Sequence, residues 1–322
     1  MNFNEVFTFD NLYECAKDCC KNVRWKTSTK NFEMNLVEIV SILYKQLQKG
    51  TYKSKGFSKF KLKGKRGKER TISAVHITER CIQKCLCRYC LEPLLIPSLI
   101  YDNSACIKNR GTDFAIKRLR RNIYNNFLIN GNNGYFLKID YSKYFENIDH
   151  QILLSKIRKK IKDDKLFNLY KYFVDNCGDK GLSLGSEISH ISAMYFVNDL
   201  DHYIKEKLKI KFYGRYMDDS YLIIKDKNEL KYILNKIKEF CNKLNIIIND
   251  RKTTIYKINK GMLFLNKHIT ISDTGKINIW CKYETRKRQN RKNKIIKNKY
   301  GENSENYKIY NQVYKHLKGK KW

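Results

Sequence analysis

The chain has 322 residues, of which 66 are Lys or Arg and 32 are Asp or Glu, so its formal charge is 66 − 32 = +34. Hydrophobic residues make up 42% and aromatic residues 13%, which excludes a disordered basic tail and is enough for about two packed domains. No apolar run approaches the ~20 residues that cross a bilayer, and residues 1–10 lack a signal-peptide pattern. We therefore expect a cytoplasmic protein with no membrane partner. Nucleic acid is the expected partner, because its phosphates offset a charge of this size.

The 11 cysteines are expected to be reduced thiols, because no secretory signal accompanies them. The densest group is Cys81, Cys85, Cys87 and Cys90. A zinc site is one interpretation, but no second Cys/His pair follows at the spacing of a zinc finger. Cys81, Cys85 and Leu86 share one face of a predicted helix, which favours cysteines buried in a core.

Two blocks carry much of the positive charge. Residues 51–70 contain nine basic residues and one acid, interleaved with Tyr52, Phe57 and Phe60. Residues 281–322 contain 14 basic residues and three acids. Cations interleaved with aromatic rings can follow a nucleic-acid backbone and stack on its bases.

Between these blocks the pattern predicts alternating strands and helices. Residues 134–140 (GYFLKID) alternate like a strand that ends in Asp140, and residues 212–225 form two short strands with Asp218 and Asp219 at their turn. Helices are predicted over 186–208, capped by Ser186, and over 229–245, where apolar residues recur at helical spacing. Two further strands are predicted at 246–249 and 253–258. This order predicts an α+β fold with a helix-covered sheet.

The three carboxylates are the sharpest chemical feature. An acidic doublet at a turn is common by itself, because Asp is a frequent turn residue. A strand end and a hairpin turn can, however, meet at one edge of an antiparallel sheet, which would bring Asp140, Asp218 and Asp219 together. Carboxylates at such an edge suit two Mg²⁺ ions, with Mn²⁺ as an alternative, and two-metal phosphoryl transfer needs that arrangement.

These residues lie in segments that resemble reverse transcriptase motifs. Asp140 in LKIDYSKYFENIDH and Asp219 in GRYMDDSYLI resemble motifs A and C, and residues 181–186 (GLSLGS) resemble motif B. Residues 249–253 (NDRKT) and 262–265 (MLFL) resemble motifs D and E. GKERTISAVHITERCIQKCLCRYCLEPLL and NRGTDFAIKRLR resemble the fingers motifs of bacterial reverse transcriptases. The resemblance covers roughly residues 51–269, in the family's order.

The resemblance implies a right-hand polymerase of α+β class, with fingers, a ferredoxin-like palm and a short helical thumb. We expect fingers at 1–134, with a helical N-terminus and a basic hairpin. We expect a palm at 135–280 that carries motifs A to E and includes a fingers segment at about 151–180, and a basic helical thumb or tail at 281–322. It further implies an RNA-directed DNA polymerase that uses deoxynucleoside triphosphates, a template RNA and a primer or cDNA.

The resemblance also implies residue roles. Asp140, Asp218 and Asp219 are the catalytic carboxylates and metal ligands, and Tyr141 adds a backbone carbonyl. The implied nucleotide-binding residues are Arg70, Lys63, Tyr144, Phe145, Leu184, Gly185 and Lys252. Among them, Phe145 is the steric gate against a 2′-hydroxyl, and Lys252 lies near the leaving pyrophosphate. Phe264 and Leu265 form the primer grip, and the nucleic-acid contacts are Lys65, Arg66, Lys68, Arg110, Arg286, Arg288 and Arg291.

Motif B indicates the subfamily. Where many relatives have Pro-Gln-Gly, this chain has Ser183, Leu184 and Gly185, and an aliphatic residue at that place resembles error-prone enzymes of diversity-generating retroelements. Their motif ends in Gln where this chain has His190. Those enzymes work with a basic accessory protein, which is therefore an expected partner.

Other interpretations stay open. A reverse transcriptase of antiphage defence, abortive infection or retron type shares the same palm, although no Val-Thr-Gly element of retrons is found near the thumb. A group II intron maturase is disfavoured because its extensions are missing. A catalytically silent RNA-binding scaffold belongs to another class, and the three carboxylates argue against it.

Overall fold

The computed structural model describes residues 1–63 and 69–319, which combine helices with antiparallel sheets as the sequence predicts. They form two compact units. Unit 1 comprises Met1–Tyr101, Ser142–Tyr203 and Glu239–Ile247, and unit 2 comprises Asp102–Tyr141, Ile204–Lys238 and Ile248–Trp322. Each unit is therefore assembled from segments that are far apart in the sequence.

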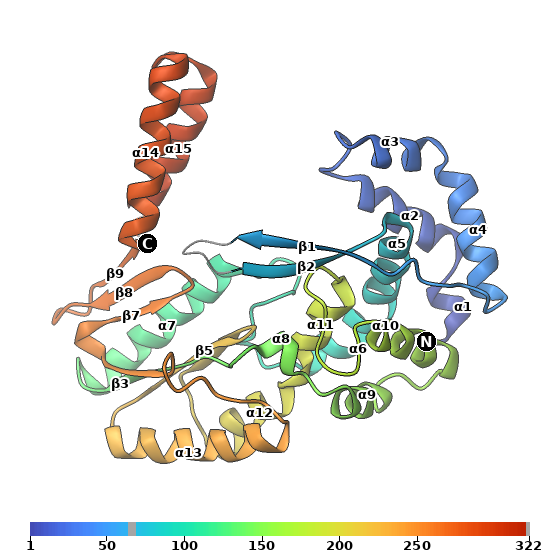
Figure 1. Ribbon diagram of the computed structural model, residues 1–322. Helices are drawn as coiled ribbons and strands as arrows, with labels where there is room; N and C mark the ends of the chain where they lie inside the picture. The colour runs from blue at the N-terminus through green and yellow to red at the C-terminus, as the bar shows by residue number, and fades with distance from the viewer. Residues whose placement is uncertain (64–68, 320–322) are drawn as a thin grey trace. The chain divides into compact units, whose positions relative to one another are not determined.

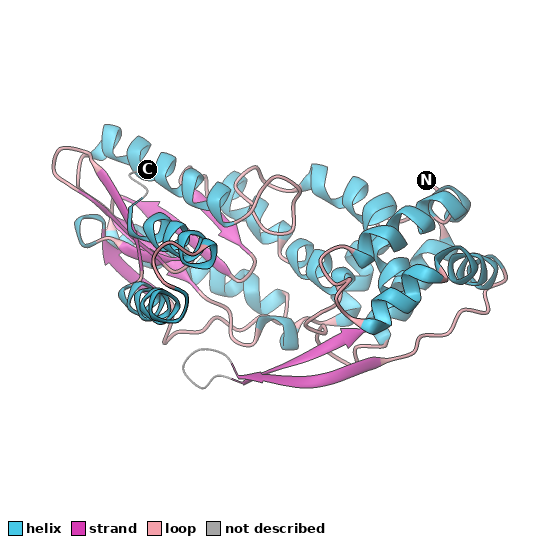
Figure 2. Cartoon of the chain, turned by 90° about the horizontal axis from the view of Figure 1, so that it is seen from above, coloured by secondary structure: helices cyan, strands magenta, loops and turns pink. Residues whose placement is uncertain are grey.

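Unit 1 is mainly helical (Figure 2). Its helices are α1 (Phe3–Val6), α2 (Phe9–Cys20), α3 (Thr27–Met34), α4 (Leu36–Gln48), α5 (Ile77–Leu86), η2 (Cys87–Leu91), α6 (Glu92–Leu95), η3 (Ile96–Ser98), α8 (Tyr144–Asn147), α9 (His150–Arg158), α10 (Asp164–Asp175), α11 (Glu187–Phe196) and α12 (Asn198–His202). The hairpin of β1 (Phe57–Lys63) and β2 (Glu69–Val75) extends from them, with Leu62 paired to Arg70.

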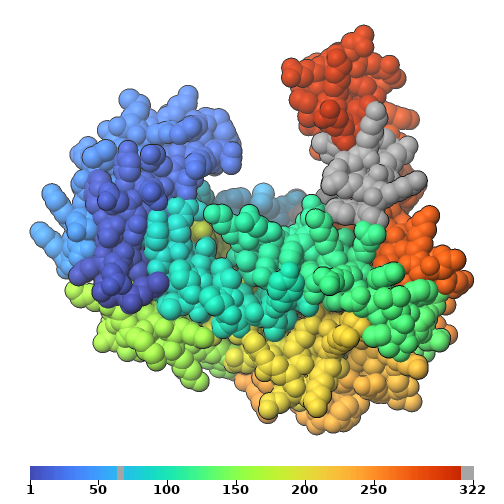
Figure 3. Space-filling model, turned by 180° about the vertical axis from the view of Figure 1, so that it is seen from behind, coloured from blue at the N-terminus to red at the C-terminus, as the bar shows by residue number. Residues whose placement is uncertain are grey.

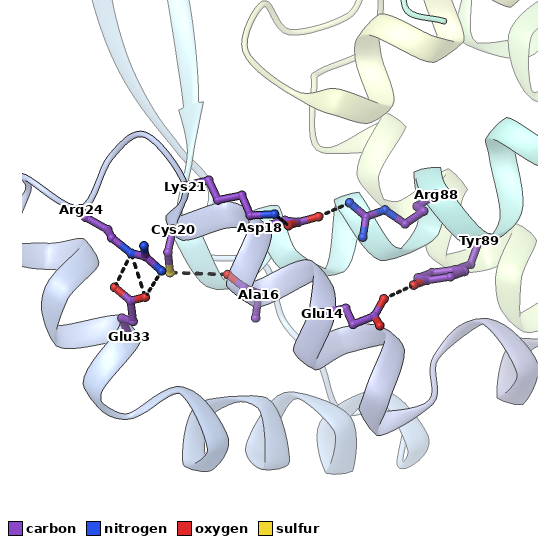
Figure 4. Close-up of polar contacts among 9 residues, drawn as sticks. All are labelled: Glu14, Ala16, Asp18, Cys20, Lys21, Arg24, Glu33, Arg88 and Tyr89. Atoms are coloured by element: carbon purple, nitrogen blue, oxygen red, sulfur yellow. Dashed lines mark hydrogen bonds and ion pairs between the residues drawn. The ribbon is translucent and has the colours of Figure 1, made fainter. Parts of the chain in front are cut away.

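Polar contacts fasten α2 to the α5–η2 segment. Asp18 binds both Lys21 and Arg88, and Glu14 accepts a hydrogen bond from the Tyr89 hydroxyl at 2.9 Å (Figure 4). Between these polar contacts α2 and α5 bury apolar and cysteine side chains. The predicted core cysteines Cys81, Cys85, Cys87 and Cys90 are all buried, which confirms that interpretation.

Unit 2 is built on a four-stranded antiparallel sheet of order β4-β5-β3-β6, of which Figure 1 labels β3 and β5. Its strands are β3 (Tyr135–Ile139), β4 (Tyr213–Tyr216), β5 (Asp219–Ile224) and β6 (Thr254–Lys257). The helices α7 (Thr112–Asn130) and α13 (Lys227–Lys243) and the short turns η4 (Tyr203–Lys207) and η5 (Ile258–Lys260) accompany them. One face of the sheet contributes Phe136, Tyr221 and Ile223 to an apolar cluster with Leu119 and Ile123 of α7.

A second sheet and a helical hairpin complete unit 2. The strands β7 (Met262–Phe264), β8 (Lys267–Ile271) and β9 (Ile277–Cys281) form a three-stranded antiparallel sheet. The helices α14 (Tyr283–Tyr300) and α15 (Glu305–Gly319) follow and pack on each other, and they form the red surface in Figure 3. Gly261, just before β7, has a φ of +68°, and a Cβ there would collide with the Ile269 carbonyl oxygen. The turn into β7 therefore requires glycine.

The predicted elements agree with the structure except in two places. The strands expected at 134–140 and 212–225 are β3, β4 and β5, and the helix expected at 229–245 is α13. The strand expected at 246–249 is wrong: it makes only an isolated bridge between Ile248 and Tyr141. The helix expected at 186–208 begins at its Ser186 cap but is interrupted at Val197. Over residues 1–63 and 69–319, no helix is both long and apolar enough to span a bilayer.

Candidate active site

The three carboxylates lie at one edge of the unit 2 sheet. Asp140 directly follows β3, whose last residue, Ile139, pairs with Ser220 of β5. Asp219 begins β5 opposite Tyr216, so Asp218 lies in the two-residue turn between β4 and β5. The strand end and the hairpin turn therefore meet at the same end of neighbouring strands, as an antiparallel register requires.

Asp140 is held by a loop that is more than a hundred residues away in sequence. Its backbone oxygen accepts a hydrogen bond from Asn249 N at 2.8 Å, and its backbone nitrogen donates to Thr253 Oγ1 at 3.4 Å. Lys252 Nζ lies 3.0 Å from Asp140 Oδ2. Three contacts from one turn thus fix both the backbone and the carboxylate of Asp140.

Asp219 forms an ion pair with a different lysine, Lys138. Lys138 Nζ lies 3.1 Å from Asp219 Oδ1, and both side chains are largely shielded, with exposed fractions of 18% and 26%. Lys138 is the penultimate residue of β3, two residues before Asp140. The pair therefore ties the strand that carries Asp140 to the first residue of β5.

Asp218 lies in a concentration of negative charge. Burial raises the pKa of its carboxyl above the ordinary value, and the charges of Asp219 and then Asp140 raise it further. The nearby Lys252 lowers this pKa by a smaller amount. A carboxyl group whose pKa is raised by neighbouring negative charge lies in a place where a cation is stabilised.

The donor set fits a hard divalent cation such as Mg²⁺, which prefers carboxylate oxygens and water. In the part of the chain that the structure describes, no three His, Cys, Asp or Glu side chains already form a cluster that could hold an ion. Asp140 and Asp219 are each paired with a lysine. Of these two lysines Lys252 is the more exposed, at 57% against 18% for Lys138.

The buried Arg215 stabilises the turn between β4 and β5 through a hydrogen bond. Its side chain is only 1% exposed, and its guanidinium donates to the Met217 carbonyl at 3.0 Å. Met217 has a φ of 54°, an unusual value for a residue with a side chain. The buried arginine therefore stabilises the backbone conformation that places Asp218 at the tip of the turn.

In unit 1 the loop that resembles motif B is bonded to strand β2 of the β1–β2 hairpin. The Leu184 carbonyl accepts a hydrogen bond from Ser73 N of β2 at 2.8 Å. Gly185 has a φ of +118°, and a Cβ there would lie 2.7 Å from the Ser73 carbonyl oxygen. Ser186 then caps α11 and also donates to Gln83 Oε1 at 2.9 Å. Close backbone approach is therefore the reason for glycine at position 185.

The predicted gate, Phe145, lies on the short helix α8 and is half-buried. Its ring centroid is 5.7 Å from that of His190 and 5.9 Å from that of Tyr144, both edge to face. The Tyr144 hydroxyl donates to the Ala193 carbonyl of α11 at 2.5 Å. Phe145 is therefore held between two aromatic rings.

The remaining predicted residues are scattered along exposed elements or buried in the core. Lys63 and Arg70 are exposed on β1 and β2, whereas Lys65, Arg66 and Lys68 lie outside the described residues. The remaining predicted residues lie in unit 2. The ring of Phe264 is buried against Tyr221, and Leu265 follows it with a φ of 46°. Tyr141 is buried, and Arg110 donates a hydrogen bond to the Asn103 carbonyl. On α14, Arg288 and Arg291 are exposed and Arg286 is half-buried.

The sequence of the whole region matches one family description. "Reverse transcriptase (RNA-dependent DNA polymerase)" matches residues 58–290, which is more than half of the chain. The chain belongs to the reverse transcriptase family. The segments that resemble motifs A, C and D of this family meet at the carboxylate edge.

Similar proteins of known sequence and structure support the assignment of this chain to the reverse transcriptase family. It is 24% identical over 279 residues to the group II intron-encoded protein LtrA of Lactococcus lactis subsp. cremoris, which covers 79% of this chain but 43% of LtrA. Apo telomerase from Candida tropicalis, truncated from its C-terminal domain, superposes with a TM-score of 0.52 at 16% identity, covering 69% of this chain and 54% of that one. Telomerase from Candida albicans, solved with a fragment of telomeric RNA, gives 0.54 at 10% identity, covering 81% and 54%.

These likenesses confirm the expected right-hand polymerase fold of α+β class. The chain spans less than half the length of LtrA, so the comparison supports the family and not the activity of the whole LtrA protein. Two site residues of this reverse transcriptase were missed by reasoning from sequence, namely Lys138 and Arg215. The available signal was a cation two residues before Asp140 and another three residues before Asp218, each inside an otherwise apolar strand.

Proposed function

We propose that the chain is an RNA-directed DNA polymerase that extends a primer by two-metal nucleotidyl transfer. The observation that carries the proposal is that Asp140 and Asp218 lie at one edge of the sheet, where burial and the charges of Asp219 and Asp140 raise the pKa of Asp218. Family membership supports the same chemistry. The substrates are then a template RNA, a primer or cDNA end and deoxynucleoside triphosphates.

Asp140 and Asp218 are the residues that would hold divalent cations, with Asp219 and the backbone carbonyl of Tyr141 beside them. When bound there, Mg²⁺ would activate the primer hydroxyl and neutralise charge on the leaving pyrophosphate, and Mn²⁺ shares its oxygen preference. The protein's part is to fix the carboxylates, which Asn249, Lys252 and Thr253 do for Asp140.

Lys252 acts on the leaving side of the reaction. Its side chain is 57% exposed, so it can exchange Asp140 for a phosphate oxygen without a large desolvation cost. There it serves as a charge clamp or as the proton donor to pyrophosphate. Arg70 and Lys63, exposed on the β1–β2 hairpin, bind the triphosphate, and the planar fork of Arg70 suits bidentate contacts with phosphate oxygens.

Phe145 selects deoxynucleotides by excluding a 2′-hydroxyl. Tyr144 and His190 flank its ring, which limits the rotation that would otherwise make room for a ribonucleotide. Tyr144 itself is fixed by its bond to Ala193. The gate is thus supported by packing on both sides.

Nucleic acid is held along basic elements. We assign residues 1–134 to the fingers, 135–280 to the palm and 281–322 to the thumb. Arg288 and Arg291, exposed on α14, bind the phosphate backbone together with Arg286, and Arg110 does so from the loop before α7. Phe264 and Leu265 position the primer through the β7–β8 turn.

The finer role that the sequence favours is error-prone synthesis in a diversity-generating retroelement, with a basic accessory protein. Leu184 supports it, because an aliphatic side chain beside the templating base cannot hydrogen-bond to check base geometry. His190, where that group has Gln, departs from its pattern. A defence reverse transcriptase is the competing role, and the error spectrum of the product distinguishes the two.

The decisive experiment is extension of a labelled primer on an RNA template. Asp218→Asn and Asp140→Asn should each reduce extension by at least ~10³-fold, since each removes a metal ligand. Asp273→Asn, an exposed aspartate in the β8–β9 turn, is the matched control and should extend like the wild type. Equal extension by wild type and Asp218→Asn would contradict the proposal, and RNA binding without any extension would favour the silent scaffold.

A further inference from the structure

Lys138 occupies an unusual position for a lysine. Side chains alternate along a strand, so Lys138 lies on the same face of β3 as Phe136, which belongs to the apolar cluster. Its direct cross-strand neighbour on β5 is Tyr221, which is 2% exposed and belongs to the same cluster. A cation on the apolar face of a sheet is costly unless a carboxylate pairs with it.

Asp219 is that carboxylate. It lies two residues before Tyr221 on β5, and a diagonal neighbour across two strands is within reach of a lysine side chain. The ion pair of 3.1 Å draws the Asp219 carboxylate toward β3. The Asp219 carboxylate is therefore already paired with the Lys138 ammonium group before any metal ion reaches the site.

The charges at the carboxylate edge of the sheet show how the ion pair between Lys138 and Asp219 affects cation binding. Asp140, Asp218 and Asp219 contribute −3, and Lys138 and Lys252 contribute +2, so the net charge is −1. Lys252 is exposed and can leave, whereas Lys138 is only 18% exposed and is confined by the sheet. After Lys252 turns away, two carboxylates face an incoming cation and the third stays paired.

We propose that Lys138 is a positioning residue that withholds Asp219 from the metal, so that divalent cations bind weakly until nucleotide phosphates supply the missing oxygen ligands. This inference rests on the proposed function, because it assigns a role at the same carboxylates. Mg²⁺ is commonly held by one or two carboxylates plus substrate phosphates, which is the ligand set that this ion pair leaves. Ion loading is thereby coupled to nucleotide loading.

The test measures Mn²⁺ binding to the full chain without nucleotide, by electron paramagnetic resonance of the free ion. Lys138→Met should tighten Mn²⁺ binding by on the order of tenfold, because it removes a nearby positive charge and releases Asp219. Lys138→Arg keeps the ion pair and should stay within about twofold of the wild type. Lys257→Met removes a charge from the neighbouring strand β6, away from the carboxylates, and is the matched control.

The double variant separates positioning from simple charge. In an Asp219→Asn background, Lys138→Met should tighten binding by no more than about threefold, since no carboxylate is left to release. Equal tightening in both backgrounds, or weaker binding in Lys138→Met with an unchanged circular dichroism spectrum, would overturn the role of Lys138. If Asp140→Asn binds Mn²⁺ as tightly as the wild type, the metal site itself is wrong and both proposals fail.

Discussion

Lys252 Nζ and Asp140 Oδ2 lie 3.0 Å apart although 112 residues separate them in the chain. The contact joins the turn after α13 to the end of β3, and Asn249 and Thr253 of the same turn bind the Asp140 backbone. We therefore expect two separable tasks for this turn, which resembles motif D. Asn249 and Thr253 fix the backbone of Asp140, and the proposed function gives Lys252 the second task of moving its charge to the leaving pyrophosphate.

Replacing Lys252 tests the second task. Lys252→Ala should lower kcat for primer extension by about 100-fold and change the KM for deoxynucleotide far less, because a proton donor or charge clamp acts on the leaving group. Single-turnover kinetics measure both constants, and Lys257→Ala serves as the surface control. A change confined to KM would assign Lys252 to nucleotide binding.

Phe145→Ala should admit ribonucleotides. Removing the ring that lies between Tyr144 and His190 opens space for a 2′-hydroxyl, so discrimination between deoxy- and ribonucleotides should fall by at least ~10-fold. The ratio of kcat/KM values for the two nucleotides measures it. Tyr232→Ala, an exposed aromatic residue of α13, is the control, and unchanged discrimination in Phe145→Ala would refute the gate.

Gly185→Ala should disturb the bond between Leu184 and Ser73. The new Cβ would lie 2.7 Å from the Ser73 carbonyl oxygen at a φ that disfavours alanine, so we expect a loss of about 2–3 kcal/mol in the free energy of unfolding. Gly178→Ala is a close control, because its φ is +112° and no heavy atom lies within 4 Å of the added Cβ. Chemical denaturation of both variants isolates the clash, and similar losses would argue against it.

Asp18→Asn should destabilise the protein at neutral pH but not in strong acid. Hydrogen bonds from Lys21 and then Arg88 lower the pKa of Asp18 from 3.8 to about 2. A depressed carboxyl pKa stabilises the fold above the unfolded value and loses that effect as pH falls from 3.8 toward 2. We expect a difference of about 1–2 kcal/mol from the wild type at pH 7 that shrinks by pH 2.5.

The measurement for Asp18 is urea unfolding at the two pH values. Asp175→Asn removes the exposed ion pair with Lys171 on α10 and should change stability by less than about 0.5 kcal/mol at either pH. A pH-independent loss in Asp18→Asn would mean that packing, not charge, fixes α2 to η2.

Leu184→Gln should improve fidelity opposite template adenines if the enzyme is error-prone, because a polar side chain restores a hydrogen bond near the templating pair. Sequencing of cDNA made on a defined RNA gives the error spectrum for wild type and variant. Leu182→Met is a conservative control in the same loop. Identical spectra for Leu184→Gln and wild type would count against the retroelement role.

Much of the fold follows from local patterns. Alternation over GYFLKID predicts β3, and helical spacing over 229–245 predicts α13, since each pattern is set by which side chains must be buried. The expected strand at 246–249 fails for a physical reason. Asn249 N and Ile248 are used to bind Asp140 and Tyr141, so the segment caps a strand end instead of extending a ladder.

By itself, the sequence determined the chemical groups of the site and their family, because carboxylates at strand ends and turns are local features in a recognisable order. Only the tertiary structure decided which cation each carboxylate meets. Lys138 and Lys252 are two of 66 basic residues, and no local pattern distinguishes them from solvated lysines. Strand register brings Lys138 to Asp219, and a turn beyond α13 brings Lys252 to Asp140. Such pairings depend on distances between segments remote in the chain, which backbone hydrogen bonding and core packing fix.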